Sequence, residues 1–417
     1  MNAFFKHLKS SEYINISNTS SLYHDELKYF NYSATVDTSY FKKMGYVIGI
    51  NNKIGGGFSL QTKELALMKC VGEVIERLCQ SCYQKSNIIY SSYNRLIKEN
   101  TIALDPTNYI FKEDVKNAKF GWVKGFDLIE DRSVYIPAQL TYNNFLTNNN
   151  EIMLTAPIST GAAAGFSHMD CLLNGICEVI ERDVNMTTYL NKIAFSPLNL
   201  MSVNGVANSY LQKCIRYNLT PYIFRQINDL EVPCFLTILI DETQLGPAIV
   251  VGSKVAPDID HAILGSIEEA LMGRMWVRSQ IRDNGFCNNF HINRKEIDTH
   301  ERTYLFWSGQ EVCKLEYLTK NKKILFAYEP KKIDKKQVLR SLIRSLSKKN
   351  MKAYYVDVTL EYFKETGIHV YKIIIPTMQA LYLDQTKPIY NMNRIKKVSD
   401  FYKKKQFKIY NFPHFFP

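Results

Sequence analysis

The pentapeptide Glu-Val-Ile-Glu-Arg occurs twice in the chain, at residues 73–77 and 178–182. Each copy lies at the end of a stretch whose residue pattern predicts a helix, so the charged residues of each copy share one helical face. With ~100° of rotation per residue, Glu73, Glu76 and Arg77 fall within about 100° of arc. Unpaired charges are costly to bury, so two copies of one mixed-charge face indicate a shared polar site. A metal ion and an anionic phosphate are the natural occupants of such a site.

The second copy belongs to a larger polar face. Measured from Asp170, four residues lie on one side of the helical wheel, at about 40°, 80°, 20° and 120°: Asn174, Glu178, Glu181 and Arg182. Pairs within the helix would contribute only ~0.2–0.5 kcal/mol each, so helix stability does not explain this density of charge. The opposite face is apolar and can pack. A merely solvated polar face remains the alternative interpretation.

A third predicted helix, over residues 260–282, adds two glutamates and three arginines spaced four apart: Glu268, Glu269, Arg274, Arg278 and Arg282. Forked guanidinium donors suit phosphate groups. Carboxylate oxygens on the first two helices suit Mg²⁺, which commonly bridges protein acids to nucleotide phosphates. The sequence has no GxxxxGKS/T, GxSxG or HExxH pattern and no GxGxxG opening a helix. The three helices therefore predict a nucleotide site without a glycine-rich phosphate loop.

Strands and helices alternate along the chain, which predicts an α/β fold (α+β mixed) with no clean linker. The charged helices are expected over residues 62–84, 168–189 and 260–282. A β-hairpin is expected from the apolar runs 233–241 and 247–255. The three consecutive glycines of residues 55–57 predict a turn before the first helix, and close approach to a phosphate is the alternative interpretation.

The formal net charge is +12, from 52 basic and 40 acidic side chains. Much of the excess lies in residues 320–335, 340–352 and 394–408. An electropositive surface suits an acidic peptide, an acidic partner or nucleic acid. A charge run is more often a solvated face, and no recognisable nucleic-acid-binding motif accompanies it. We therefore predict no nucleic-acid partner.

No secretory signal is apparent, and the most apolar stretches, 234–240 and 248–251, are too short to span a bilayer. The nine scattered cysteines favour free thiols in a reducing compartment. Cys79 and Cys82 form the only CxxC, without a second ligand pair at zinc spacing, so we interpret them as core residues. The chain is predicted to be cytoplasmic and to have no membrane partner.

At the charged helices the chain resembles a YcaO-domain protein, over about residues 50–417 and in the family's motif order. The residues that carry the resemblance are Lys69-xxx-Glu73-xx-Glu76-Arg77, then the small-residue loop 159–165 with Asp170 and Glu178-xx-Glu181-Arg182, then Glu269-Ala270-xxx-Arg274. One such motif is weak, but the ordered set is specific. The resemblance implies a YcaO-type ATP-binding fold with several intertwined subdomains. Residues 46–417 would form the ATP-dependent catalytic domain, and residues 1–45 a peripheral N-terminal extension.

In that family glutamates hold Mg²⁺ beside ATP. The resemblance assigns five residues to the metal: Glu73, Glu76, Asp170, Glu178 and Glu181. It assigns five others to ATP: Arg77, Asn174, Arg182, Glu269 and Arg274. The chain departs from the family pattern at Lys69 (serine expected), Phe166 (asparagine common), Met272 (glutamine common) and Asp170, which is shorter than the usual glutamate. These departures leave a catalytically inactive binding subunit as one alternative.

Azoline-forming members of the family end in a proline-rich tail that reaches the active site. Pro413 and Pro417 resemble a reduced version of that tail, and we interpret the Pro417 carboxylate as a general base. An ordinary frayed terminus is the alternative. The implied activity is an ATP-dependent cyclodehydratase of bacteriocin biosynthesis. A Cys, Ser or Thr side chain of a ribosomal precursor peptide attacks the preceding amide, ATP phosphorylates the oxygen, and loss of phosphate leaves a thiazoline or oxazoline.

The resemblance also implies partners. They are the ribosomal precursor peptide, a leader-binding partner protein of the E1-like type, and a dehydrogenase in a thiazole/oxazole synthetase complex. The nearest alternative reaction is thioamide or amidine formation by the same ATP-activating machinery. That reaction would tolerate loss of the C-terminal prolines.

Overall fold

The computed structural model describes residues 13–20, 24–49, 54–110, 114–143, 145–147, 151–156, 158–243, 246–284, 297, 307, 309–329 and 332–416. The chain divides into two compact units. Unit 1 comprises residues 1–22, 29–179 and 334–377, and unit 2 comprises residues 23–28, 180–333 and 378–417. Each unit is assembled from segments far apart in the sequence. Mixed helix and sheet in both units confirms the predicted fold class.

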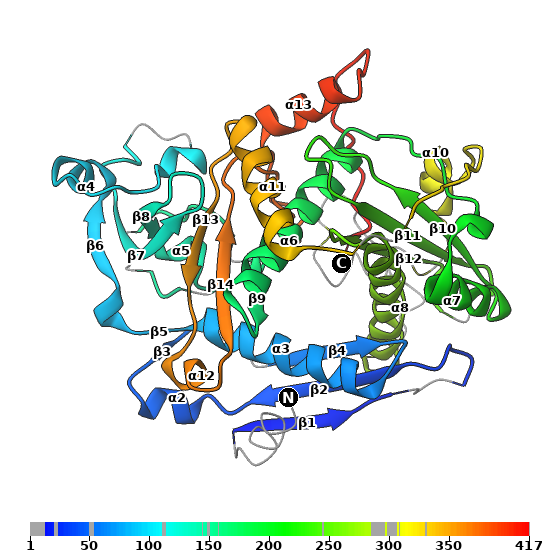
Figure 1. Cartoon of the computed structure of the whole chain (residues 1–417), viewed down its shortest axis with the longest axis horizontal. Helices are drawn as coiled ribbons and strands as arrows, with labels where there is room; N and C mark the ends of the chain where they lie inside the picture. The colour runs from blue at the N-terminus through cyan, green and yellow to red at the C-terminus, as the bar shows by residue number, and fades with distance from the viewer. Residues whose placement is uncertain are drawn as a thin grey trace. The chain divides into compact units, whose positions relative to one another are not determined.

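Unit 1 contains a small antiparallel sheet covered by a long helix. The strands are, in spatial order, β1 (Ile14–Asn18), β2 (Phe30–Val36) and β4 (Ile54–Ser59). Helix α3 (Lys63–Ser81) lies along this sheet in Figure 1 and begins after Thr62, whose side chain accepts a hydrogen bond from the Leu65 amide. Residues 14–18 and 30–36, which fall within the predicted N-terminal extension, therefore supply two strands of unit 1.

The predicted turn at residues 55–57 is wrong, because these glycines are the middle of β4. A Cβ atom at Gly57 would lie 2.0 Å from the Ala66 carbonyl oxygen, and one at Gly55 would lie 2.5 Å from the Val74 amide nitrogen. The glycines thus allow the strand backbone to pack directly on the helix backbone. Strand propensity does not reveal such a strand, because glycine is normally depleted in strands.

The larger sheet of unit 1 has six strands. Five run in spatial order β6 (Ile89–Ser92), β7 (Lys119–Asp127), β13 (Tyr354–Asp357), β14 (His369–Ile374) and β9 (Ala162–Gly165), and β8 (Arg132–Pro137) also pairs with β7. All the pairings are antiparallel. Shorter elements of the unit are α2 (Ser39–Lys43), β3 (Val47–Ile48), β5 (Cys82–Tyr83), α4 (Tyr93–Lys98), α5 (Ala138–Thr141), α11 (Lys335–Lys348) and α12 (Glu361–Lys364). Cys79 and Cys82 are free and buried, as predicted for core residues.

Unit 2 is built on the antiparallel sheet β10 (Leu219–Arg225), β11 (Cys234–Asp241) and β12 (Ile249–Val255). β11 and β12 form the predicted hairpin, and every residue of the central β11 is buried. Helix α8 (Ile259–Asn284) packs on β12 and β11. Other α-helices in the described part of unit 2 are α7 (Gly205–Arg216), α10 (Glu316–Thr319) and α13 (Met392–Phe401). Helix α6 (His168–Leu190) begins in unit 1 and continues into unit 2 at residue 180.

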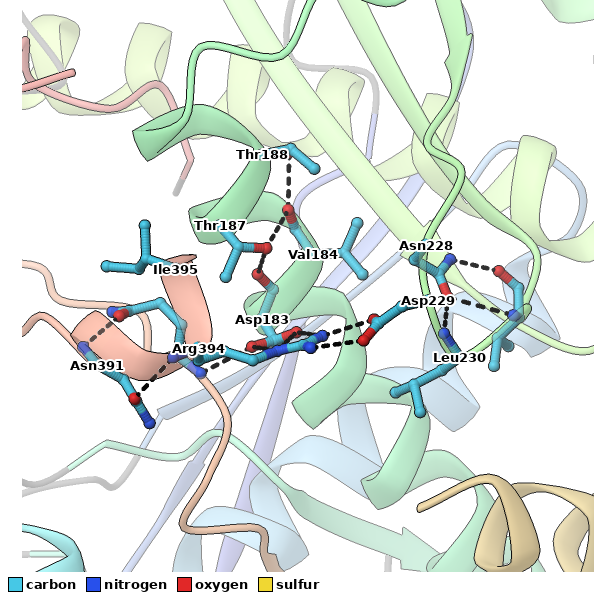
Figure 2. A network of polar contacts seen from close by, with 12 residues as sticks. Asp183, Val184, Thr187, Thr188, Asn228, Asp229, Leu230, Asn391, Arg394 and Ile395 are labelled. Carbon is cyan, nitrogen blue, oxygen red and sulfur yellow. Dashed lines mark hydrogen bonds and ion pairs between the residues drawn. The ribbon is translucent and has the colours of Figure 1, made fainter. Parts of the chain in front are cut away.

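A buried charge network holds α13 to α6 in unit 2. Figure 2 shows the Arg394 guanidinium between the carboxylates of Asp183 and Asp229. Arg394 Nη2 donates to Asp183 Oδ2 at 2.6 Å, and Nη1 donates to Asp229 Oδ2 at 2.7 Å. Burial disfavours the charged guanidinium, but the two carboxylates outweigh this and raise the Arg394 pKa above its ordinary range. The Gln379 amide also donates to Asp183, at 2.8 Å, so the network joins four segments.

Candidate functional site

The first acidic cluster lies in unit 1, on α3. Glu73 Oε2 accepts a hydrogen bond from the Gly56 amide at 2.6 Å, and the same carboxylate forms an ion pair with Arg77. Arg77 Nη1 also donates to the Ile54 carbonyl at 2.5 Å. Both side chains are half-buried. The first and last residues of the pentapeptide are therefore held together at the start of β4, and Glu76 is left apart from that pair.

Glu76 is the least satisfied carboxylate of this cluster. It is half-buried, and no donor among the described residues forms a hydrogen bond with it. Burial raises its pKa well above the ordinary value, and the negative charges of Glu178 and Glu73 raise it further. Arg77 and Lys372 oppose this effect without cancelling it. A cation placed beside these three glutamates would relieve their repulsion.

Lys372, which the sequence analysis did not single out, lies close to these acids. Its buried ammonium donates to the carbonyls of Ile158 and Thr160 at 2.7 and 2.8 Å. Burial lowers its pKa to about 8, although the charges of Glu178 and Glu76 act in the opposite direction. Glu178 itself accepts a hydrogen bond from the Gly161 amide at 3.2 Å. The only sequence signal for Lys372 is one lysine inside an otherwise apolar strand.

Asp170 and Asn174 stand apart from the glutamates. Asp170 accepts a hydrogen bond from Ser167 Oγ at 2.7 Å, and its own amide donates back to that oxygen at 3.1 Å, so Ser167 caps the start of α6. It also pairs with Lys335 at 2.6 Å. Burial raises the Asp170 pKa, but the bonds from Lys335 and Ser167 outweigh this and lower it. Asn174 is exposed. Their assignments to metal and nucleotide stay predictions.

A second acidic pair lies in unit 2 along the edge of β12. Glu181 Oε2 accepts from the Val255 amide at 2.8 Å, and Glu269 Oε2 accepts from the Ser253 amide at 2.5 Å. β12 is the last strand of its sheet, so these alternate amides point away from β11. Burial and the charge of Glu181 raise the Glu269 pKa to about 7, against the opposing charge of Arg182. One strand edge thus positions carboxylates from two helices.

Arg274, predicted to bind phosphate, has protein partners at all three guanidinium nitrogens. It pairs with Glu26 at 2.8 Å and with Asp241 at 2.7 Å, and it donates to the Pro247 carbonyl at 3.3 Å. Its side chain is only 3% exposed. The buried ion pairs connect α8 to β11 and to the short segment 23–28, which is a structural role. Sequence reasoning missed Glu26 and Asp241, because no local pattern indicates pairing with distant segments; Glu26 is 248 residues away from Arg274.

The C-terminal tail is packed into unit 2 as far as it is described. Pro413 is buried, and its carbonyl accepts a hydrogen bond from the Tyr189 hydroxyl at 2.8 Å. The Tyr410 amide donates to the Leu190 carbonyl at 2.7 Å. The Phe416 ring is 4% exposed. Pro417, the predicted general base, lies outside the described residues.

The other departures from the family pattern are at accessible positions. Lys69 is exposed, and its ammonium donates to the Phe58 carbonyl at 3.1 Å. Phe166 and Met272 are 51% and 38% exposed. None of the three is part of a core, so their identities are not explained by packing.

Both acidic clusters fit magnesium bound together with a nucleotide. Among the described residues, no group of three or more His, Cys, Asp or Glu side chains forms a metal site by itself. Magnesium in nucleotide sites needs only one or two carboxylates, because phosphate oxygens and water complete its shell. Burial and the neighbouring carboxylates raise the pKa values of Glu76 and Glu269, which disfavours their charged forms. A divalent cation beside them would stabilise those charged forms.

Comparison with known proteins agrees with this geometry. Residues 59–379 match the model of the family described as YcaO cyclodehydratase, ATP- and Mg²⁺-binding. The chain belongs to the YcaO family. The predicted cofactors, ATP and Mg²⁺, are those of the family description. A comparison with curated protein sequences gives no significant match.

Three solved structures illustrate the shared YcaO fold. A heterocyclase in complex with substrate and cofactor has a TM-score of 0.70 at 16% identity, and the match covers 88% of this chain and 50% of that one. The chain therefore spans about half the length of that heterocyclase. YcaO from Methanopyrus kandleri, bound with AMPPCP and Mg²⁺, has a TM-score of 0.64 at 14% identity, with 91% and 89% covered. The E. coli microcin synthetase McbBCD complex with pro-MccB17 bound contains a chain with a TM-score of 0.63 at 13% identity, with 95% and 96% covered.

In the part of the chain that is described, no helix is long and apolar enough to cross a membrane.

Proposed function

We propose that this YcaO protein is an ATP-dependent cyclodehydratase that converts Cys, Ser or Thr residues of a ribosomal precursor peptide into thiazoline or oxazoline. The observation that carries the proposal is the carboxylate of Glu76, which has a raised pKa beside Glu73 and Glu178 and no hydrogen bond from a described residue. A cation would stabilise the ionised form of this cluster, and the family is described as binding ATP and Mg²⁺.

In unit 1, Glu73, Glu76 and Glu178 would hold magnesium. Glu181 would do the same in unit 2, where Arg182 and Glu269 would contact the nucleotide. When bound, Mg·ATP supplies the phosphoryl group that turns an amide oxygen into a leaving group. The protein's own contribution is mainly positioning and charge neutralisation, which is what phosphoryl transfer requires. The β12 amides serve that purpose by fixing one oxygen of Glu181 and one of Glu269.

The anchored tail favours azoline formation over the related thioamide and amidine reactions. Azoline formation requires a proton to leave the attacking Cys, Ser or Thr side chain. In the proposal the Pro417 carboxylate accepts it, and the buried Pro413 limits where the chain end can go. Removal of residues 413–417 should therefore abolish azoline formation. Unchanged peptide modification after that truncation would favour the thioamide or amidine alternative.

The partners follow from the same proposal. We expect the protein to act with a leader-binding protein of the E1-like type that delivers the precursor peptide, and with a dehydrogenase that oxidises the azoline. The likeness to a chain of the McbBCD complex supports a multi-protein assembly.

The decisive experiment combines the protein with its genomic-neighbour partner, the precursor peptide and Mg·ATP. Mass spectrometry of the peptide should show the loss of one water for each modified residue, and ADP should accumulate. An unchanged peptide mass without ADP would overturn the enzymatic proposal and favour an inactive binding subunit.

A single variant connects that result to the acidic site. Glu181→Gln keeps an acceptor for the Val255 amide but loses the negative charge, so it should abolish turnover while the protein stays folded. The matched control is Glu64→Gln in the exposed first turn of α3, which should leave turnover unchanged. Activity of Glu181→Gln close to that of the control would remove Glu181 from the site.

A further inference from the structure

Helix α11 (Lys335–Lys348) has an unusual distribution of charge. It contains five basic residues and no acidic one. Four of them recur at four-residue spacing and form what we call the α11 stripe: Lys336, Arg340, Arg344 and Lys348. All four are exposed, and within the described residues no carboxylate forms an ion pair with any of them. Leu342 and Leu346 are buried, so the helix rests on its apolar side and presents the stripe to solvent.

This arrangement is unfavourable for an isolated helix. Like charges four residues apart destabilise a helix by ~0.2–0.5 kcal/mol for each pair, and the stripe contains three such pairs. Lys336 also lies in the first turn, where the helix dipole disfavours a cation. A solvated face would avoid both costs with alternating charges. The α11 stripe instead has only positive charge, which destabilises its own helix but suits the binding of an anionic ligand.

The stripe begins close to the unit 1 acids. Lys335, its neighbour in the chain, pairs with Asp170 in the first turn of α6 at 2.6 Å. Glu178 is eight residues further along α6, which is ~12 Å along the helix axis. About four residues of extended chain span that distance. A peptide held on the stripe could therefore place a nearby residue beside Glu178.

We propose that the α11 stripe docks an acidic segment of the peptide substrate, which makes that peptide a direct ligand of this chain. The four cations are spaced ~6 Å apart along the helix, close to the ~7 Å between alternate side chains of an extended peptide. A segment with an acidic residue at every second position would match them. The identity of the occupant as substrate rests on the proposed function, whereas the surface and its preference for acidic peptide do not.

Fluorescence anisotropy of the full chain tests the surface directly. The probe is a labelled twelve-residue peptide in which Glu alternates with Ser, and its comparison is the same peptide with Gln in place of Glu. The triple variant Arg340→Gln/Arg344→Gln/Lys348→Gln should weaken binding of the acidic probe at least ~tenfold at ~50 mM salt, and the difference should shrink at ~500 mM. The control variant Lys396→Gln/Lys405→Gln/Lys408→Gln removes the same charge from exposed positions of unit 2 and should change binding less than ~twofold.

Three results would overturn the proposal. The Gln peptide could bind as tightly as the Glu peptide, or the two triple variants could weaken binding equally. A twelve-nucleotide oligothymidylate could bind more tightly than the acidic peptide with the same dependence on the stripe, which would identify a nucleic-acid surface. All substituted positions are exposed, and equal thermal unfolding of the two variants verifies that both fold.

Nucleotide binding separates this proposal from the proposed function. If wild-type protein binds the acidic probe through the stripe but does not bind Mg·ATP by calorimetry, the docking surface holds and the cyclodehydratase proposal fails. If the protein processes the precursor and the triple variant leaves the KM for that peptide unchanged, the docking proposal fails alone. The expected result is a KM for the precursor raised at least ~tenfold, in line with the probe affinity.

Discussion

The Tyr189 hydroxyl on α6 donates its single proton in a bifurcated hydrogen bond to the carbonyl oxygens of Phe412 and Pro413, at 3.0 and 2.8 Å. The Tyr189 ring also contacts the rings of Tyr410 and Phe416, with centroids 5.3 and 6.0 Å apart. Tyr189 is thus the side chain through which α6 holds the C-terminal tail. Glu181 lies two turns earlier on the same helix, so within unit 2 one rigid element carries both a proposed magnesium ligand and the tail anchor.

Tyr189→Phe tests whether that anchor matters for catalysis. The change keeps the ring and removes the hydroxyl, and the net loss of a typical hydrogen bond is about 1 kcal/mol. If the tail acts in the reaction, azoline formation should fall about fivefold to tenfold while Mg·ATP affinity is retained. The control is Tyr317→Phe, a nearby half-buried tyrosine whose hydroxyl makes no hydrogen bond to the described part of the tail. Equal rates for the two variants would show that the anchor has no catalytic role.

The ionisation of Glu269 predicts how stability depends on pH. Burial and Glu181 raise the Glu269 pKa from 4.5 to about 7, so between these values the folded protein binds more protons at this site than the unfolded chain. The stability that this carboxyl contributes is therefore full below its unfolded pKa and is lost as the pH rises through about 7. Above that pH its contribution no longer changes.

Glu269→Gln cannot titrate, so its free energy of unfolding should fall less than that of wild type between about pH 5 and pH 8. Urea unfolding without magnesium measures both slopes. Glu76 has a pKa raised in the same direction, so part of the slope should remain. Glu64→Gln should keep the full wild-type slope, and a Glu269→Gln slope identical to it would contradict the assigned pKa.

Much of the fold could be predicted because local patterns determine it. Apolar periodicity and the Thr62 cap specify α3, and the charged faces of α6 and α8 have the same helical period. The apolar runs 233–241 and 247–255 specify the β11–β12 hairpin, because they are strand-sized and separated by a short turn. The motifs on these helices were sufficient to predict the family, because each motif is contained within a few turns.

The unpredicted features depend on contacts between distant segments. β4 is rich in glycine and was missed, because its strand conformation is stabilised by packing on α3 rather than by its own residues. The Arg274 side chain matches a phosphate-binding motif, but Glu26 and Asp241 take its donors. Lys372 has no neighbouring signal that would place it beside Glu76 and Glu178. A single sequence does not show which residues of such distant segments lie next to one another in the fold.

The close packing of β4 on α3 gives a pair of opposite predictions for glycine substitutions. Gly57→Ala would place a Cβ atom 2.0 Å from the Ala66 carbonyl and 2.2 Å from the Cys70 amide nitrogen, so β4 must move away from α3. The displacement would also disturb the bond from the Gly56 amide to Glu73. We expect a loss of at least ~2 kcal/mol in stability together with weaker Mg·ATP binding.

Gly72→Ala on the same helix is the matched comparison. Nothing lies within 4 Å of a Cβ atom built there, and alanine favours a helix over glycine, so stability should rise by ~0.5–1 kcal/mol. Chemical denaturation of both variants measures the two effects. A Gly57→Ala protein as stable as wild type would mean that the strand and helix are not in direct backbone contact.

The network in Figure 2 gives the last prediction, which concerns the stability of unit 2. Arg394→Met would leave the carboxylates of Asp183 and Asp229 without their shared cation, and Asp183 is fully buried. Removing one member of a buried ion pair typically lowers the free energy of unfolding by about 3–5 kcal/mol, and we expect a loss of that size for Arg394→Met. The control Arg132→Met, at an exposed position, should change stability by less than ~0.5 kcal/mol.

The double variant Asp183→Asn/Arg394→Met separates the lost charge pair from lost packing. Its neutral amide needs no counter-ion, and its oxygen can still accept the hydrogen bond from the Gln379 amide. The double variant should therefore be more stable than Arg394→Met, as measured by thermal unfolding. If it is instead less stable, the stabilisation comes from packing of the arginine stem and not from the carboxylates. Because Asp183 follows Glu181 and Arg182 on α6, the recovered stability should come with recovered Mg·ATP binding if this network keeps those side chains in place.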